Sequence, residues 1–528
     1  MRIGIDVGGT NTDSAVLDGT RVAVWAKTPT TADVLDGVAA VLRNVASQVD
    51  MGAVDAVNIG TTHFVNALVE VRGLAPVVAI RLATPPQTLE PMVNWPVALR
   101  DAVLGEVHVC AGGHQFTGVP MQPLDVEALR KIARSATARG LRQFAVSSVF
   151  SPVNAEGERL AADIIRAECP EASVTLSHEI GRLGILEREN AAILNAALRP
   201  LAAHVVAGFA SAMAEVGLSV PLNVSQNDGT VMGLELAREF PMLTFASGPT
   251  NSMRGAAFEV GAGDCVVVDV GGTTTDIGLL QGGFPRESAL AVDVAGVRTN
   301  FRIPDVVSLA IGGGSIVRGD SDSDTVTVGP DSVGHQLTER ALVFGGDTLT
   351  LTDVAVAAGV AVVGDPALVT DLDPSVVDAT LRLVRTRIAE AIDKAKLQAG
   401  DVAVVAVGGG AFLVGDRMPG VAEVTRPAHA PVANAVGAAA ANVSGEIDQL
   451  YSLMTQTRDE ALADARAQAV AKAVHAGAAV DTVRIVDEED IPLAYLEDSA
   501  AIRVRVRAVG DLPATESNNS KDSVDVAG

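Results

Sequence analysis

The stretch IDVGGTNTD at residues 5–13 recurs as VDVGGTTTD at residues 268–276, and this duplication decides the fold. Between residues 5–19 and 268–282, nine of the 15 aligned positions are identical. Each copy has an apolar run that ends in Asp, then a Gly-Gly pair, then a Thr-rich segment that becomes apolar again. This order is typical of a strand, a tight turn and a returning strand. Because an internal repeat reports on architecture, we predict two related half-domains that face each other across a phosphate chain.

The residue types in both copies suit a phosphate site. Glycine has no Cβ, so backbone N–H groups can approach an anion closely, and threonine hydroxyls add uncharged donors. Asp6 and Asp269 each end the first strand of their copy. A carboxylate would repel phosphate unless a cation lay between them, which predicts Mg²⁺ with retained waters. Asp13 and Asp276 have a structural alternative, in which they bind backbone at the base of each hairpin.

Composition fits a large enzyme and argues against several other classes. The 528 residues suffice for more than one core, and 48% of them are hydrophobic but only 3% aromatic. A net charge of −25 argues against a nucleic-acid partner. Three widely separated cysteines support neither a disulfide framework nor a zinc site. No segment indicates a membrane span, and the chain begins directly with a predicted strand, so we expect a cytoplasmic protein.

The periodicity of apolar residues predicts an α/β protein. Residues 31–49 have apolar positions at helical spacing, and residues 54–59 form an apolar run that predicts a strand. A long helical stretch is expected at 188–216, interrupted by Pro200. Residues 502–507 alternate between apolar residues and arginine, which predicts a half-exposed strand. Alternation of strands with helices favours mixed or parallel sheets.

A third segment, DVAVVAVGGGAF at residues 401–412, joins an apolar strand to a glycine cluster. In order after the two hairpins, it makes the chain resemble the actin-like ATPases, which include the sugar kinases and the heat-shock chaperones. That resemblance implies two facing ribonuclease H-like domains with a nucleotide cleft between them, plus a small C-terminal unit. We expect a first half at 1–180, a second half at 181–450, the C-terminal unit at 451–513 and a disordered tail at 514–528.

Further segments resemble the hydantoinase/oxoprolinase family, in its order and over nearly the whole chain. They are GTTHFVNA (60–67), SHEI (177–180), EREN (187–190) with NA (195–196), QNDG (226–229), FASGP (245–249), GGGSI (312–316) and VGPDSVG (328–334). The resemblance implies ATP-dependent hydrolytic opening of a hydantoin, 5-oxoproline or another lactam through phosphorylation of the amide oxygen. Phosphorylation makes an unreactive ring carbon electrophilic, while the protein mainly positions groups and stabilises charge. The chain is similar to the shorter A-type members, which implies a separate B-type subunit.

The resemblance also implies roles for particular residues. Asp6 and Asp269 would be catalytic and would orient Mg²⁺ or its waters; in an alternative role, Asp269 positions the nucleophile. The residues expected at ATP are Gly8, Gly9, Thr10, Asn11, Thr12, Gly271, Gly272, Thr273, Thr274, Thr275, Gly312, Gly313, Gly408, Gly409 and Gly410. Those expected at the substrate are Thr61, Thr62, Asn66 and Arg188. For Arg188, which begins a predicted helix, a solvated or capped helix face stays open as an alternative.

Other functions stay open. A small-molecule kinase of the same superfamily shares the hairpins, but sugar kinases with this opening usually carry a clustered-cysteine zinc motif, which three scattered cysteines cannot form. A nucleotide-gated scaffold would lack the family segments at 177–196, and a radical-dehydratase activator would need cysteines that ligate a cluster. Phosphate release from ATP, with and without lactams or sugars, distinguishes these functions.

Overall fold

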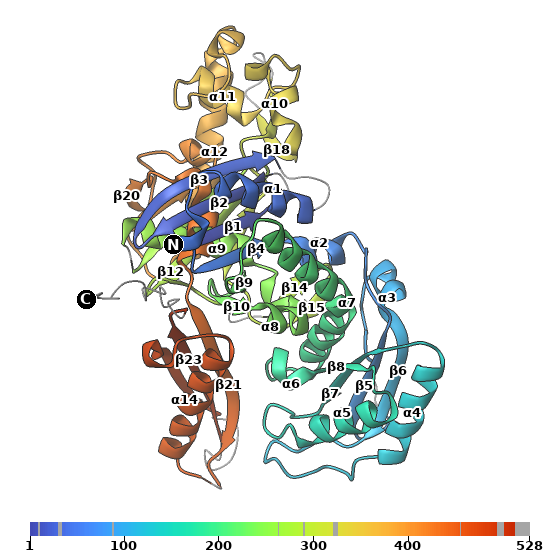
Figure 1. Cartoon of the computed structure of the whole chain (residues 1–528). Helices are drawn as coiled ribbons and strands as arrows, with labels where there is room; N and C mark the ends of the chain where they lie inside the picture. Colours follow the sequence, from blue (N-terminus) through green and yellow to red (C-terminus); the bar gives the residue numbers. More distant parts are fainter. Residues whose placement is uncertain are drawn as a thin grey trace, which may run out of the picture.

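The computed structural model confirms an α/β protein with mixed sheets (Figure 1). It describes residues 1–8, 11–29, 34–86, 89–261, 263–288, 291–319, 326–454, 456–493 and 501–512. Gly9, Thr10 and the tail expected at 514–528 lie outside the described residues.

The first glycine hairpin belongs to a nine-stranded sheet with the order β22-β23-β21-β10-β9-β4-β1-β2-β3. Its strands are β1 (Arg2–Val7), β2 (Asn11–Asp18), β3 (Arg21–Pro29), β4 (Ala56–Thr61), β9 (Leu222–Ser225), β10 (Val231–Gly233), β21 (Val443–Ser452), β22 (Arg484–Pro492) and β23 (Ala501–Gly510). The sheet takes strands from all three expected chain segments, and β21 runs across the boundary expected at residue 450. Some neighbouring strands, such as β4 with β9 and β10 with β21, are therefore distant in sequence, and no local pattern reveals their pairing.

The second glycine hairpin lies in a six-stranded sheet with the order β13-β12-β11-β19-β20, with β16 paired to β12. These strands are β11 (Cys265–Val270), β12 (Thr275–Gln281), β13 (Phe284–Pro285), β16 (Val306–Leu309), β19 (Val402–Val407) and β20 (Val421–Thr425). β11 pairs antiparallel with β12 and parallel with β19, just as β1 pairs antiparallel with β2 and parallel with β4. The repeated sequence is therefore a repeated strand arrangement, and both copies form the predicted hairpin.

The helix α7 (Ile185–Glu215) packs between α1 (Val34–Ala46), which covers the nine-stranded sheet, and a separate four-stranded parallel sheet (Figure 1). That smaller unit contains β5 (Val77–Ala83), α3 (Val97–Val103), β6 (Leu104–Ala111), α4 (Val126–Ala138), β7 (Gln143–Ser148), α5 (Glu156–Glu168) and β8 (Ser173–Leu176). α7 continues through Pro200, where the sequence predicted an interruption. By length and composition alone α7 could cross a membrane, but 61% of its most apolar window is buried inside the molecule. It is a core helix held by its contacts on both sides.

Two helices cross between the hairpin sheets in backbone contact. α9 (Ser247–Val260) contacts β11, and α13 (Ala433–Ala440) contacts β1. A Cβ on Gly255 of α9 would lie 1.9 Å from the Ala433 carbonyl oxygen, and a Cβ on Gly437 of α13 would lie 1.8 Å from the Asn251 carbonyl oxygen. Glycine at both positions therefore allows the helices to approach this closely.

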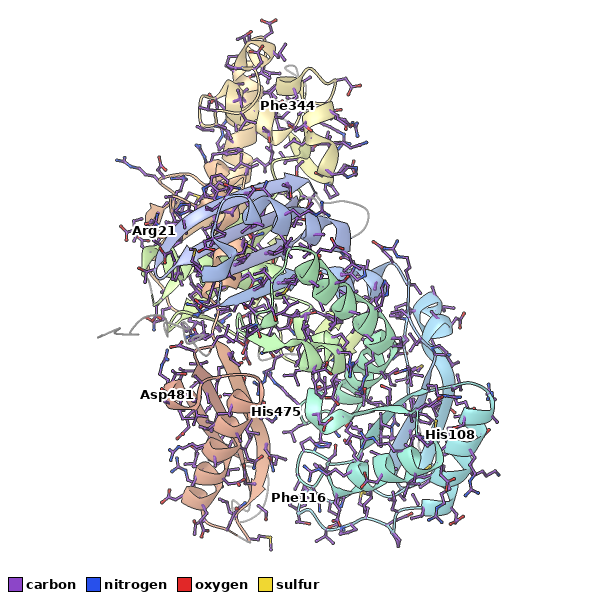
Figure 2. The ribbon with its side chains drawn as sticks, in the orientation of Figure 1. Arg21, His108, Phe116, Phe344, His475 and Asp481 are labelled. Atoms are coloured by element: carbon purple, nitrogen blue, oxygen red, sulfur yellow. The ribbon has the colours of Figure 1, made fainter. Side chains whose placement is uncertain are left out.

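The C-terminal strands β21–β23 extend the nine-stranded sheet and are covered by α14 (Arg458–His475). Figure 2 places His475 on this unit and His108 on the four-stranded unit beside it. The strand predicted at 502–507 is present within β23, but its arginine face is more covered than the alternation predicted. Arg507 is buried and lies opposite Glu446 of β21, with which it forms an ion pair. Carboxylates on the neighbouring strand β21 neutralise the arginines, which explains why this face can be more buried than the sequence predicted.

Candidate nucleotide site

The two glycine turns close with the same hydrogen bond. In the first, the Gly8 N–H donates to the Asn11 carbonyl at 3.0 Å. In the second, the Gly271 N–H donates to the Thr274 carbonyl at 2.8 Å. These two N–H groups are occupied inside their turns, so an anion would bind to the amides that follow them.

Both turns line one pocket of about 360 Å³. Of the residues expected at ATP or substrate, the pocket brings together Asp6, Gly8, Asn11, Thr62, Asp269, Gly271, Gly272, Thr274, Gly313, Gly408, Gly409 and Gly410. Leu337, Val363 and Phe412 add apolar wall. A cavity that is polar over the hairpins and apolar beyond them suits a molecule with a charged chain and a flat base.

Asp6 is held by amide side chains from the two crossing helices. Its Oδ1 accepts from Asn251 Nδ2 at 3.0 Å, and its Oδ2 accepts from Asn434 Nδ2 at 3.0 Å. Burial raises the pKa of Asp6 to about 6; the amide hydrogen bonds oppose this rise and the neighbouring Asp13 adds to it. A bound cation would favour the charged form, so the site is suited to take up a metal ion.

Asp13 shares its partners with Asp6. Lys27 Nζ lies 2.9 Å from both carboxylate oxygens of Asp13, and Asn434 Nδ2 donates to Asp13 at 2.9 Å. Asn434 therefore bridges two carboxylates of the first hairpin. The partners of Asp13 are side chains, where the structural alternative expected backbone. Lys27 and Asn434 both line the pocket, and the sequence analysis missed them.

Asp269 occupies the equivalent position in the second hairpin. Burial raises its pKa to about 6; a hydrogen bond with Ser252 of α9 opposes the rise, and Asp276 adds to it. Gly408 lies against this carboxylate, because a Cβ there would be 2.3 Å from Asp269 Oδ1. With a φ of +85°, Gly408 also has a backbone conformation that other residues rarely adopt. Asp276 itself accepts a hydrogen bond from Ser308 Oγ at 2.5 Å.

The glycines at 313–314 orient the second turn. The Gly313 N–H donates to the Gly271 carbonyl at 2.9 Å, and the Gly314 N–H donates to the Gly272 carbonyl at 2.7 Å. In a trans peptide the C=O and the following N–H point in opposite directions. The N–H groups of Gly272 and Thr273 therefore point away from 313–314, and no hydrogen bond within the described part of the chain uses them. Two main-chain donors are thus left for an anion.

Three residues expected at ATP lie behind the turns. Thr12 and Thr275 are fully buried in their strands, and Thr275 Oγ1 donates to the Ile311 carbonyl at 2.6 Å. Gly312 supports the second turn from behind, where a Cβ would lie 2.6 Å from the carbonyl carbon of Gly272. None of these three lines the pocket, so they shape the hairpins and do not contact a ligand there.

The segment at 60–67 reaches the pocket through one residue. Thr62 lines the pocket, at the start of α2 (His63–Val69). Thr61 is buried, and its Oγ1 accepts from the His63 N–H at 3.1 Å. Asn66 is exposed one turn further along and donates to Thr62 Oγ1 at 3.4 Å. Only Thr62 of the three expected residues is therefore placed to contact a ligand in this pocket.

Arg188, which was expected at the substrate, lies outside this pocket, and its hydrogen bonds indicate a structural role. Its side chain is fully buried and does not line the pocket. Nη1 donates to the carbonyl of Arg182 at 2.9 Å, Nη2 donates to the carbonyl of Ser148 at 2.6 Å, and Nε donates to Ser177 Oγ at 2.9 Å. These bonds tie the start of α7 to β7 and to the 177–183 segment. The sequence of a family motif alone does not show whether its arginine is a buried structural residue or a ligand contact.

The carboxylates fit the magnesium ion that ATP chemistry requires. In the described residues no group of three or more His, Cys, Asp and Glu side chains gathers as a metal site. Mg²⁺ bound with phosphates needs only one or two carboxylates, since waters and phosphate oxygens complete its coordination. Asp6 and Asp269 line the same pocket and interact electrostatically. Two carboxylates, Asp6 and Asp269, suit a metal ion that binds together with a nucleotide.

Comparison with known proteins identifies the family of the chain. Residues 2–169 match the hydantoinase/oxoprolinase N-terminal region, and residues 188–363 match the hydantoinase/oxoprolinase family. The chain belongs to the hydantoinase/oxoprolinase family. This family member is 28% identical to caprolactamase subunit alpha from Pseudomonas jessenii, over 74% of its own chain and 58% of that protein. It is 27% identical to the acetophenone carboxylase gamma subunit from Aromatoleum aromaticum, over 68% of its chain and 53% of that protein.

The hydantoinase/oxoprolinase chain spans a little over half the length of these curated relatives. The solved structure of the ATP-dependent caprolactamase from P. jessenii aligns with a TM-score of 0.75, at 20% identity, over 99% of this chain and 90% of that one. The nucleotide-free structure of acetone carboxylase aligns with a TM-score of 0.65, at 19% identity, over 97% of this chain and 88% of that one. These likenesses show a shared fold.

Proposed function

We propose that this chain is the ATP-using subunit of an enzyme that opens a cyclic amide by hydrolysis, after phosphorylation of the amide oxygen. The observation that supports it most is that two matched glycine turns, the buried Asp6 and the partly buried Asp269 line a single pocket. Family membership favours an amide or related carbonyl compound as the substrate. The two hairpin halves would act as facing domains of the actin-like ATPase type, with the nucleotide between them.

In this proposal, the main-chain donors hold phosphate and the carboxylates hold the metal. The N–H groups of Gly272 and Thr273 bind phosphoryl oxygens, and Asp6 and Asp269 hold Mg²⁺, which would neutralise charge on the phosphates. Asn434 keeps Asp6 and Asp13 in position, while Lys27 adds positive charge at the same edge of the pocket. The chain contributes chiefly by orientation and by stabilising charge that develops in the transition state.

A second subunit is part of the proposal. The relatives are named as subunits, namely the alpha subunit of caprolactamase and the gamma subunit of acetophenone carboxylase. Thr62 is the one expected substrate residue that reaches the pocket, so this chain alone offers few contacts to an amide ring. We propose that the partner supplies the remaining contacts to the ring.

The test is phosphate release from ATP by the chain alone and by the native complex recovered with it. Hydantoin, 5-oxoproline and caprolactam are each added, with glucose as the control for a kinase. Stimulation by a cyclic amide, accompanied by the ring-opened product, supports the proposal. Stimulation by glucose, or turnover that no cyclic amide changes in the recovered complex, contradicts it.

ATP-dependent carboxylation is the second candidate, because one relative is a carboxylase subunit and acetone carboxylase shares the fold. The same phosphate pocket would serve such a reaction. Incorporation of labelled bicarbonate into a ketone by the recovered complex, without ring opening of any amide, would favour this candidate.

A further inference from the structure

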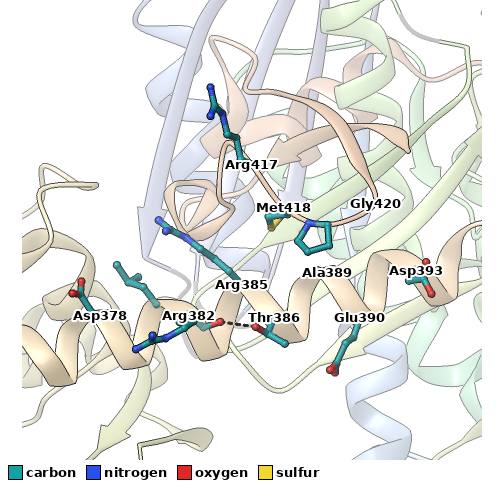
Figure 3. A pocket seen from close by; sticks show the side chains of 12 residues that line it. Asp378, Arg382, Arg385, Thr386, Ala389, Glu390, Asp393, Arg417, Met418 and Gly420 are labelled. Atoms are coloured by element: carbon teal, nitrogen blue, oxygen red, sulfur yellow. Dashed lines mark hydrogen bonds between the residues drawn. The ribbon is translucent and has the colours of Figure 1, made fainter. Parts of the chain in front are cut away.

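A second cavity lies on the outer face of α12 (Pro374–Ala395) and is shown in Figure 3. It has a volume of about 680 Å³ and is bounded by α12 and by the loop that leads to β20. It shares no lining residue with the nucleotide pocket. We call this cavity the α12 groove, and it is separate from the site described above.

Three arginines line the α12 groove: Arg382, Arg385 and Arg417. Among the described residues, none of their guanidinium groups has an ion pair or a hydrogen bond, and Arg385 Nε is buried without a partner. Arg382 and Arg417 are exposed at the rim of the groove, whereas Arg385 is partly buried in its wall. Arg426, which lies close by in sequence, pairs with Asp416 at 2.7 Å. Unpaired guanidinium groups at the edge of a cavity are strong candidates for binding an anion.

The local structure holds these arginines on one face. Arg382 and Arg385 are three residues apart on α12, so both face the groove. Gly415 allows the loop to lie against Arg385, because a Cβ there would be 3.1 Å from Arg385 Cδ. Figure 3 shows the side chains of Arg385 and Arg417 extending toward the same side of the groove. The charge is therefore concentrated at one end of the cavity.

Acidic and apolar residues complete the lining. Glu390 and Asp393 lie toward the other end in Figure 3, and Asp393 pairs with Lys396 at 3.3 Å. Asp378 is the carboxylate nearest the basic end along α12. Apolar wall comes from Leu381, Ala389, Met418 and Pro419. Positive charge therefore gathers at one end of the groove, where three arginines face one carboxylate beside an apolar surface, while Glu390 and Asp393 balance the lining as a whole.

We propose that the α12 groove binds a small anion with an apolar body, held through a carboxylate or a phosphate group. Arginine binds either oxyanion through parallel hydrogen bonds, and the cavity volume lies in the range of small-ligand sites. The apolar wall takes the body of the ligand. This binding does not depend on the proposed amide chemistry, because the groove and the nucleotide pocket have no residue in common.

The test is calorimetry on the full chain with two probes, inorganic phosphate and hexanoate, in the presence of saturating Mg-ADP. We expect binding of at least one probe, weakened at least tenfold in Arg385→Gln and in Arg417→Gln. Binding of phosphate only, or of hexanoate only, identifies which oxyanion the groove prefers. The matched control is Arg387→Gln, which removes the same charge from an exposed position of α12 outside the groove.

Two results overturn this proposal. One is that neither probe binds to the wild-type chain. The other is that Arg385→Gln and Arg417→Gln bind both probes as tightly as Arg387→Gln does. The comparison among variants separates the groove from the nucleotide pocket even if a probe also enters that pocket. Circular dichroism of all three variants checks that each remains folded.

Discussion

Asn434 Nδ2 lies 3.0 Å from Asp6 Oδ2, although 428 residues of chain separate them. The contact joins the end of the first hairpin strand to a helix near the C-terminal part of the fold. The same amide reaches Asp13, so one side chain fixes two carboxylates at the edge of the pocket. The geometry of the candidate site therefore depends on the crossing helices as much as on the hairpins.

Replacing Asp6 or Asp269 by Asn should reduce ATP turnover at least 100-fold while the chain remains folded. Each change removes a negative charge that the metal requires but keeps the shape of the side chain. Phosphate release at saturating Mg²⁺ measures the effect, and circular dichroism checks the fold. Asp18→Asn, on the exposed end of β2, is the control and should be neutral. Wild-type turnover in either site variant would show that the assignment is wrong.

The raised pKa of Asp269 predicts how the stability of the metal-free protein depends on pH. Its pKa rises from 3.8 to about 6, so the folded state binds more protons than the unfolded state between these values. The free energy of unfolding should fall as pH rises through this window. Asp269→Asn should then be more stable than wild type at pH 8, on the order of 2 kcal/mol, with the difference vanishing below pH 4. Urea denaturation in EDTA at both pH values measures this; equal stabilities at pH 8 would contradict it.

Two glycine substitutions should weaken nucleotide binding for different reasons. A Cβ on Gly272 meets nothing within 4 Å, and the residue lines the pocket, so Gly272→Val should fill the space that phosphate requires. A Cβ on Gly312 would collide with the second turn from behind, so Gly312→Ala should displace the N–H groups of Gly272 and Thr273. Calorimetry with ADP should show at least tenfold loss in both.

Gly233→Val is the control for these two substitutions. A Cβ at Gly233 also meets nothing within 4 Å, but this residue ends β10 and does not line the pocket. It should bind ADP like the wild type. Unchanged affinity in Gly272→Val would contradict the hairpin assignment.

Arg188→Met should destabilise the fold and leave the affinity for a substrate unchanged in whatever protein remains folded. Removing a buried charged side chain leaves the carbonyls of Ser148 and Arg182 without their donors, which costs about 3 kcal/mol or more. Thermal denaturation measures the loss, and KM for the amide tests the role. A raised KM with no change in melting temperature would restore the substrate role.

Gly437→Val should be among the most destabilising single changes in the chain. A side chain here collides with the backbone of Asn251 in α9, and the backbone cannot move aside as a flexible side chain can. We expect loss of soluble protein or a lowering of the melting temperature by about 3 °C or more, from a penalty above about 3 kcal/mol. Gly233→Val serves again as the control, and a normal melting temperature in Gly437→Val would contradict this view of the helix crossing.

Local patterns were sufficient to predict the repeated hairpins and several helices. The Asp-Pro pair at 373–374 is typical of a helix start, and α12 begins there, where Asp373 Oδ1 accepts from the Ser375 N–H at 2.8 Å. The glycine-rich turn at 408–410 was expected to border the nucleotide, and it lines the pocket with both hairpins. Each of these features is contained in a few consecutive residues, so sequence alone displays it.

The remaining site residues could not be found in this way. Asn251, Ser252 and Asn434 come from two helices whose polar residues have no distinctive spacing in the sequence. The buried partners of the family motif at 187–190 cannot be identified from the sequence. Arg188 was therefore expected at a substrate, whereas the structure shows it bonded to Ser177 Oγ. Sheet order likewise depends on pairings between strands hundreds of residues apart, such as β10 with β21.

The contact between Gly255 and Gly437 lets the spacing of α9 and α13 change in one direction only. Hydrogen is already the smallest possible substituent at both positions, so no mutation there can bring the two helices nearer to each other. Every alternative residue at either position forces them apart. An engineer who wants a tighter grip on a smaller substrate must therefore change the loops, since closer packing of these two helices is no longer available.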